Sequence, residues 1–186
     1  MRISKYTWLS FVLMVVVAAI YRAIPDRPWG FAPQFAMGIF AGALITDRKL
    51  AFALPLISLL LSDALYEILH RFGFTEIVGF YSGMLENYLL IGSLTLIGFF
   101  INPNKASSIA KGCIASPTLF FFLSNTLTWM GNGGLQRPKT FSGLVQALID
   151  GLPFYGNSLI ATFVFAAILF GSYQLILRRE TVSRLS

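Results

Sequence analysis

The stretch Leu50–Leu69, LAFALPLISLLLSDALYEIL, decides the fold class of this chain. It is an apolar run of the length, about 20 residues, that an α-helix needs to cross the hydrocarbon core of a bilayer. Its charged side chains, Asp63 and Glu67, lie towards its C-terminal end. The stretch therefore indicates a transmembrane helix.

The rest of the chain has the same apolar character. Of its 186 residues, 56% are hydrophobic and 12% are charged, whereas soluble domains carry about 25% charged residues. These values exclude a cytosolic enzyme, a disordered chain and a secreted disulfide scaffold. We expect one all-α domain over residues 1–186, a polytopic membrane protein with six transmembrane helices. We place these helices at about residues 6–24, 32–46, 50–69, 83–101, 109–129 and 153–177.

The second of these runs is short for a span and rich in small residues. Gly38 and Gly42 form a GxxxG pattern, which lets two helices approach closely. We expect this helix to be buried among its neighbours.

The basic residues predict the orientation in the membrane. If the N-terminus is inside, cytoplasmic segments hold more Lys and Arg than outer segments, as the positive-inside rule requires. The inner set is Arg2, Lys5, Arg48, Lys49, Lys105, Lys111, Arg178, Arg179 and Arg184. The outer set is Arg22, Arg27, Arg71, Arg137 and Lys139. We expect both termini in the cytoplasm and the protein in a cell inner membrane, with its positive charge setting topology rather than binding nucleic acid.

The longest connection between runs has a helical pattern of its own. Apolar residues recur at helical spacing from Phe141 to Leu152, Thr140 can cap the start, and Gly151 can end the segment. We expect an amphipathic helix at about 141–150 on the outer face. It could be an interfacial connector or a lid over a pocket.

Polar side chains inside the predicted spans gather in one half of the bundle. Asp63, Glu67 and His70 share one face of their helix, and charged groups inside a span need a reason to be there. With the orientation above, the polar residues of the other runs also fall in the outer half. This asymmetry predicts a pocket open to the outside.

We expect this pocket to bind a small-molecule substrate. The predicted contact residues are Asp63, Glu67, Tyr81, Asn125 and Trp129, with His70, Glu86 and Asn157 as further ligands or as a gate. The sequence contains no GxSxG, HExxH or Walker A motif and no cluster of His and Cys at metal spacing. We therefore expect no catalytic residue, no metal site and no cofactor.

Several short motifs, in order, resemble a known transporter family. They are FAMGIFAG at Phe35–Gly42, Leu54-Pro55-Leu56 leading to Ser62-Asp63, the turn with Tyr81, Ser124-Asn125 with Trp129, and Gly151-Leu152-Pro153-Phe154-Tyr155. This order is similar to the BtuM-type solitary S components, the cobalamin-uptake branch of the energy-coupling-factor transporters. It is also similar to a related, uncharacterised family of six-helix bacterial membrane proteins.

The resemblance implies an S-component fold with a substrate pocket in its outer half. It also implies capture of the substrate from outside and delivery by reorientation of the bundle, with or without an energy-coupling membrane subunit and its ATPases. One departure concerns the substrate. Cobalamin members carry a cobalt-ligating cysteine near the turn into the fourth run, whereas Gly79–Leu85 reads GFYSGML, and Cys113 lies on the opposite side.

The leading hypothesis is a substrate-binding transporter subunit, not an enzyme. It would take up a vitamin-like small organic compound, with cobalamin or another corrinoid still open. One alternative is a non-transporting scaffold subunit that binds a larger complex through Gly38 and Gly42. The other is an intramembrane enzyme that uses Asp63, Glu67 and His70 as acid and base.

Overall fold

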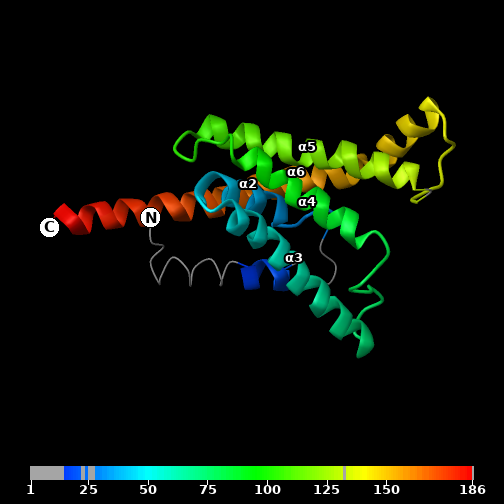
Figure 1. The fold of residues 1–186 in the computed structure, drawn as a ribbon, viewed down its shortest axis with the longest axis horizontal. Helices are drawn as coiled ribbons and strands as arrows, with labels where there is room; N and C mark the ends of the chain where they lie inside the picture. The colour runs from blue at the N-terminus through cyan, green and yellow to red at the C-terminus, as the bar shows by residue number, and fades with distance from the viewer. Residues whose placement is uncertain (1–14, 22–23, 25–27, 132, 186) are drawn as a thin grey trace.

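The computed structural model describes residues 15–21, 24, 28–131 and 133–185, with side chains described as far as residue 176. Six helices and no strand occur in this part of the chain, which confirms the all-α class (Figure 1). The first includes residues 15–21; residues 6–14 and 22–23 of the helix expected there lie outside the described residues. The others are α2 (Gln34–Leu44), α3 (Arg48–Arg71), α4 (Met84–Gly98), α5 (Ala106–Met130) and α6 (Phe141–Leu185).

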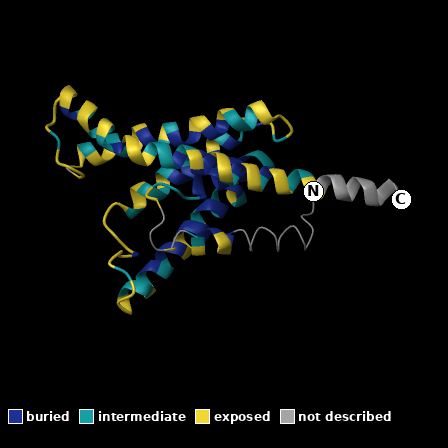
Figure 2. Cartoon of the chain, turned by 180° about the vertical axis from the view of Figure 1, so that it is seen from behind, coloured by how far each residue is buried: buried dark blue, intermediate teal, exposed yellow. Residues whose placement is uncertain are grey.

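Helix α2 forms the centre of the bundle. It contacts α3, α4, α5 and α6, and every residue from Gln34 to Gly42 is buried. Seen from behind, the buried residues concentrate where these helices meet (Figure 2). The prediction of a short helix buried among its neighbours is confirmed.

Glycines allow α2 to lie directly against α4. A Cβ atom added to Gly42 would overlap the carbonyl oxygen of Thr95 and lie 2.8 Å from the Cα of Gly98. Gly38 is less crowded, because the nearest atom to its added Cβ would be 3.6 Å away, on Leu94. The close approach predicted from the GxxxG pattern therefore occurs within this chain, and Gly42 is its tightest point.

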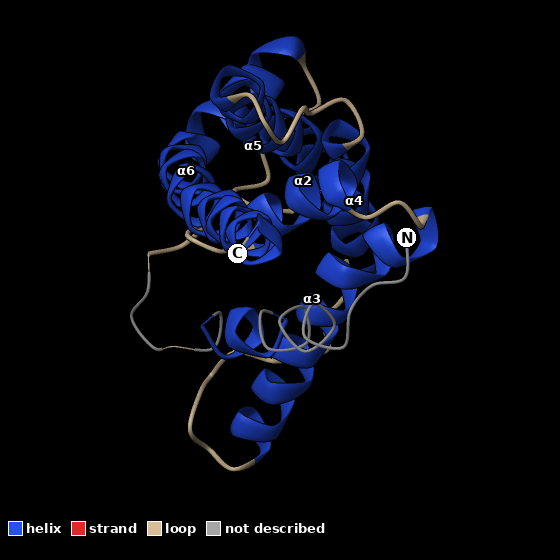
Figure 3. Cartoon of the chain, turned by 90° about the vertical axis from the view of Figure 1, so that its left-hand side faces the viewer, coloured by secondary structure: helices blue, strands red, loops and turns tan. Residues whose placement is uncertain are grey.

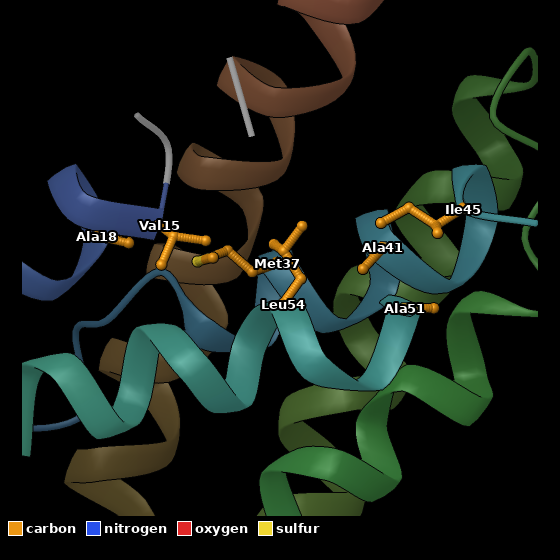
Figure 4. Close-up of a cluster of buried hydrophobic side chains, with 7 residues drawn as sticks. All are labelled: Val15, Ala18, Met37, Ala41, Ile45, Ala51 and Leu54. Atoms are coloured by element: carbon orange, nitrogen blue, oxygen red, sulfur yellow. The ribbon is translucent and has the colours of Figure 1, made fainter. Parts of the chain in front are cut away.

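A buried apolar cluster joins the first helix to α2 and α3. Its side chains approach one another between the three segments (Figure 4). Ser58 adds a hydrogen bond from its hydroxyl group to the carbonyl oxygen of Val15, at 3.4 Å. The members of the cluster are Val15, Ala18, Met37, Ala41, Ile45, Ala51 and Leu54.

The expected break before the last helix is absent. Helix α6 runs without interruption through Gly151 and Pro153 to Leu185, so the separate outer helix at 141–150 and the end of that helix at Gly151 were wrong. The expected cap is present, since Thr140 Oγ1 accepts a hydrogen bond from the amide of Gly143 at 3.2 Å. The yellow first turns of α6 lie at an angle to the rest of the helix, which runs from orange to red (Figure 1). Pro153 accounts for a bend rather than an end, because proline removes one helical hydrogen bond.

Three of the described helices are long and apolar enough to cross a membrane. They are Arg48–Arg71, Ala106–Met130 and the Phe141–Ile176 part of α6. The helices α2 and α4 have 11 and 15 residues, or roughly 16 and 22 Å at 1.5 Å per residue. Each is shorter than a hydrocarbon core of about 30 Å, so the structure supports three of the six expected spans by length and composition.

Candidate functional site

A cavity of about 280 Å³ lies between the N-terminal parts of α2, α4 and α6 and the C-terminal half of α5. Its lining combines aromatic rings with carboxamide and hydroxyl groups. The lining residues are Gly30, Ala32, Gln34, Phe35, Leu59, Asn87, Ile91, Pro117, Phe120, Phe121, Ser124, Asn125, Gly151, Phe154, Tyr155 and Ser158. Among these residues there is no ionisable acid or base apart from the phenol of Tyr155. The cavity therefore suits uncharged groups.

Gln34 is the exceptional residue of this lining. Its side chain is 1% exposed, and within the described part of the chain neither its Oε1 nor its Nε2 has a hydrogen-bond partner. It is the first residue of α2, and Pro33 before it provides no side-chain cap. A buried carboxamide without partners is unfavourable by about 1–3 kcal/mol per unsatisfied group.

Several other polar groups around the cavity are already hydrogen-bonded to the protein. Asn125 Nδ2 donates to the carbonyl oxygen of Phe121 at 2.7 Å. The Tyr155 hydroxyl is hydrogen-bonded to Thr118 Oγ1 at 3.0 Å, and Asn87 Nδ2 donates to the Tyr81 hydroxyl at 2.9 Å. Gln34 differs from them, because both polar atoms of its side chain are buried without a hydrogen-bond partner among the described residues.

The segment before α2 is held tightly against α6. Ser158 donates to the carbonyl oxygen of Gly30 at 3.0 Å, and Asn157 Nδ2 donates to that of Trp29 at 2.9 Å. Gly30 has φ +82°, and an added Cβ would lie 2.7 Å from the carbonyl oxygen of Phe154. Glycine is therefore required at Gly30 for both its conformation and the close packing. Asn157, predicted as a ligand or gate, fastens this segment instead.

Asn125 is the predicted contact residue that lines the cavity. The acidic and basic groups of α3 do not, because the C-terminal half of α3 diverges from α5 and α6 (Figure 3). Asp63 is 1% exposed and accepts a hydrogen bond from the Tyr88 hydroxyl of α4 at 2.8 Å. Glu67 pairs with Arg71 one turn later, at 2.8 Å.

The remaining predicted residues also lie outside the lining. His70 Nδ1 is 3.0 Å from the carbonyl oxygen of Thr75, in the loop that follows α3. Tyr81 accepts a hydrogen bond from Asn87, which does line the cavity, and Glu86 is exposed on the first turn of α4. The Trp129 indole donates to the carbonyl oxygen of Pro138 at 2.8 Å.

The loop between α5 and α6 is fastened at more than one point. Besides the bond from Trp129, Arg137 forms two hydrogen bonds to the Asp150 carboxylate, at 2.8 and 2.9 Å. Bidentate pairs of this kind have a fixed geometry, and this one raises the pKa of Arg137 above its ordinary value. The loop and the start of α6 thus form one braced unit.

Comparison with known proteins places the chain in a family. Residues 3–184 match a family of unknown function, DUF6580. The chain belongs to the DUF6580 family. No curated protein and no solved structure matches it.

Sequence reasoning missed the most informative residue of this DUF6580 chain. Gln34 is the strongly polar residue of an otherwise apolar and small-residue helix, and it directly follows Pro33. That isolation within QFAMGIFAGAL was a visible signal, because a buried polar group needs a partner. The other polar lining residues that the predicted site did not include are Asn87, Ser124, Tyr155 and Ser158.

The described residues offer little for metal chemistry. No group of three or more His, Cys, Asp or Glu residues that could hold a metal ion occurs among them. The groups at the cavity are amides, hydroxyls and aromatic rings, which can form hydrogen bonds and stacking contacts.

Proposed function

We propose that this chain is a multi-span membrane protein of the cell inner membrane that binds a small organic compound. In this proposal it is the substrate-binding subunit of a transporter and takes up the compound from outside. The observation that carries the proposal is the cavity with a buried, unpartnered Gln34. Pockets with mostly apolar walls and a few placed polar groups are typical of ligand sites.

The exposed surface supports membrane embedding. Each of the three long helices contains an apolar stretch of 18 residues, and only 22–39% of that stretch is buried inside the protein. Most of the apolar side chains of these helices therefore point outward. In water a surface of this kind leads to aggregation. Large exposed apolar residues include Leu85, Phe100, Phe122, Phe141, Ile160 and Ile168.

The position of the cavity supports uptake from outside. The cavity lies towards the end that carries the loops after α3 and α5, which is the less basic end in the predicted topology. The more basic segments, at residues 45–49 and 102–111, lie at the opposite end with the C-terminal end of α6 (Figure 1). We propose that both termini are cytoplasmic and that an energy-coupling subunit acts from that side.

The size of the cavity favours a compound smaller than a corrinoid. About 280 Å³ lies just below the range of roughly 300–1,000 Å³ that drug-sized ligands occupy. We therefore propose a small vitamin-like compound.

The scaffold alternative has less support, because its proposed binding surface is occupied. Gly38 and Gly42 face α4 of the same chain, so they offer no free surface to a second protein.

The enzyme alternative needs Asp63, Glu67 and His70 to act on one substrate. Their contacts are with Tyr88, Arg71 and Thr75, respectively.

Native mass spectrometry of the protein in mild detergent tests the proposal. We expect a co-purifying small molecule, and we expect Ser124→Phe to abolish it, since Ser124 lines the cavity and phenylalanine would fill part of it. The matched control is Leu123→Phe, because Leu123 is 39% exposed and does not line the cavity. If nothing co-purifies, or if both variants retain the molecule equally, the proposed function is wrong.

Gly151→Ala should weaken retention of that molecule several-fold with little loss of stability. An added Cβ would lie 2.7 Å from Asn125 Nδ2, so the amide must rotate and the wall changes shape. Alanine gains about 1 kcal/mol of helix propensity over glycine, which offsets part of the strain. Gly156→Ala in the same helix meets no atom within 4 Å and should retain the molecule fully. Equal retention by the two variants would show that the Asn125 wall does not contribute to binding.

A further inference from the structure

We infer that the bound compound is uncharged and presents an amide-like edge, a carbonyl oxygen beside an N–H group, to Gln34. This inference rests on the proposed function, because it assigns the chemical class of the compound in the same cavity. It has three supports: the neutrality of the lining, the two unpartnered atoms of one carboxamide, and the aromatic walls.

The lining excludes ionic compounds. The residues that line the cavity include no Asp, Glu, Lys, Arg or His. An ion transferred from water into such a site would have no oppositely charged side chain beside it. Burying an unpaired charge is strongly unfavourable. A carboxylate, a phosphate or an ammonium compound therefore does not fit, whereas a neutral polar compound does.

Gln34 sets the hydrogen-bond pattern. Its Oε1 is an acceptor, its Nε2 is a donor, and the two belong to one planar group. Both lack a partner within the described chain, and the side chain is 1% exposed. An amide, lactam or urea edge satisfies both atoms with two parallel hydrogen bonds. A compound with a lone carbonyl satisfies one atom and leaves the other buried and unpaired, which is unfavourable.

Aromatic rings line the same cavity as Gln34. The centroids of the Phe35 and Phe120 rings are 4.7 Å apart, and those of Phe121 and Tyr155 are 5.0 Å apart. All four residues line the cavity. Rings of this kind favour a flat apolar or aromatic body by stacked or edge-to-face contacts. The volume of about 280 Å³ limits that body to one or two small rings.

The test uses three benzene derivatives of similar size and one lactam as probes. Benzamide and uracil carry the edge, N,N-dimethylbenzamide lacks the N–H groups, and benzoate is charged. Binding is measured by calorimetry and by thermal shift on the full chain in mild detergent. We expect benzamide and uracil to bind at least tenfold more tightly than the other two.

Gln34→Met separates the proposed pairing from general packing. Methionine keeps the volume but removes both hydrogen-bonding atoms, so we expect the dissociation constant of benzamide and uracil to rise at least tenfold. The empty variant should melt at a higher temperature than the wild type, because the unpaired amide is gone. A merely structural Gln34 would give the opposite change in melting temperature. Gln34→Leu, a second apolar variant, serves if Gln34→Met does not fold.

The outcomes separate this inference from the proposed function. The ligand class is wrong if benzoate binds as tightly as benzamide, if neither benzamide nor uracil binds at millimolar concentration, or if Gln34→Met leaves their affinity unchanged. A co-purified compound that is lost in Ser124→Phe but carries no amide-like edge overturns the class and keeps the proposed function. The absence of any compound sensitive to Ser124→Phe overturns the proposed function itself.

Discussion

Replacing Gly42 by alanine is expected to lower the free energy of unfolding by about 3 kcal/mol, the upper part of the range for overpacked sites. The added Cβ would overlap the Thr95 carbonyl oxygen and press on the Cα of Gly98. These are backbone atoms, so α2 and α4 must separate. For a chain of this size the expected fall in melting temperature is roughly 6–12 °C, measured by thermal unfolding in one detergent.

Gly38→Ala is the matched control for this prediction. Gly38 lies one turn earlier on the same helix, and its added Cβ would come no closer than 3.6 Å to a neighbour. That is an ordinary contact, so this variant should melt near the wild-type temperature. Equal melting temperatures for the two variants would show that the α2–α4 contact is not as close as described.

Replacing Tyr88 by phenylalanine is expected to lower the free energy of unfolding by about 2–3 kcal/mol without affecting the cavity. The Tyr88 hydroxyl donates to Asp63 Oδ2 at 2.8 Å, and Asp63 is 1% exposed. Removing a donor from a buried acidic group costs more than removing one from a neutral group. Neither residue lines the cavity, so binding of the co-purified molecule should not change.

Tyr173→Phe is the control for the loss of a tyrosine hydroxyl. Tyr173 is half-buried and packs its ring edge-on against Phe40, with centroids 6.3 Å apart. Thermal unfolding should show little change for this variant. If Tyr88→Phe instead retains full stability and loses the co-purified molecule, Asp63 belongs to the binding site, as the sequence alone suggested.

The positions of the helices could be predicted because their signals are local. The apolar run Leu50–Leu69 became α3, with Asp47 capping its start by accepting hydrogen bonds from the amides of Lys49 and Leu50. The prediction failed where a local signal was ambiguous. Gly151 and Pro153 favour the end of a helix, by about 1 and about 3 kcal/mol relative to alanine. Helix α6 nevertheless passes through both, and its packing against α5 offsets this preference.

The candidate site was harder to predict, because periodicity gives a face of a helix but not its neighbour. Asp63, Glu67 and His70 do share a face of α3, yet that face meets α4 and the loop after α3. Of the residues expected to converge, Asn125 lines the cavity and faces α6. Gln34 became recognisable only when its surroundings showed that no partner was available.

The continuity of α6 connects the cavity with the turn between α4 and α5. Beyond Pro153, Phe154, Tyr155 and Ser158 line the cavity. Five turns further on, Gln174 Nε2 holds the turn between α4 and α5, with bonds of 3.0 Å to Pro103 and Asn104. The cavity wall and the contact at Gln174 thus belong to one continuous helix. In the proposed function, a compound in the cavity would contact the same helix that holds this turn about 30 Å away.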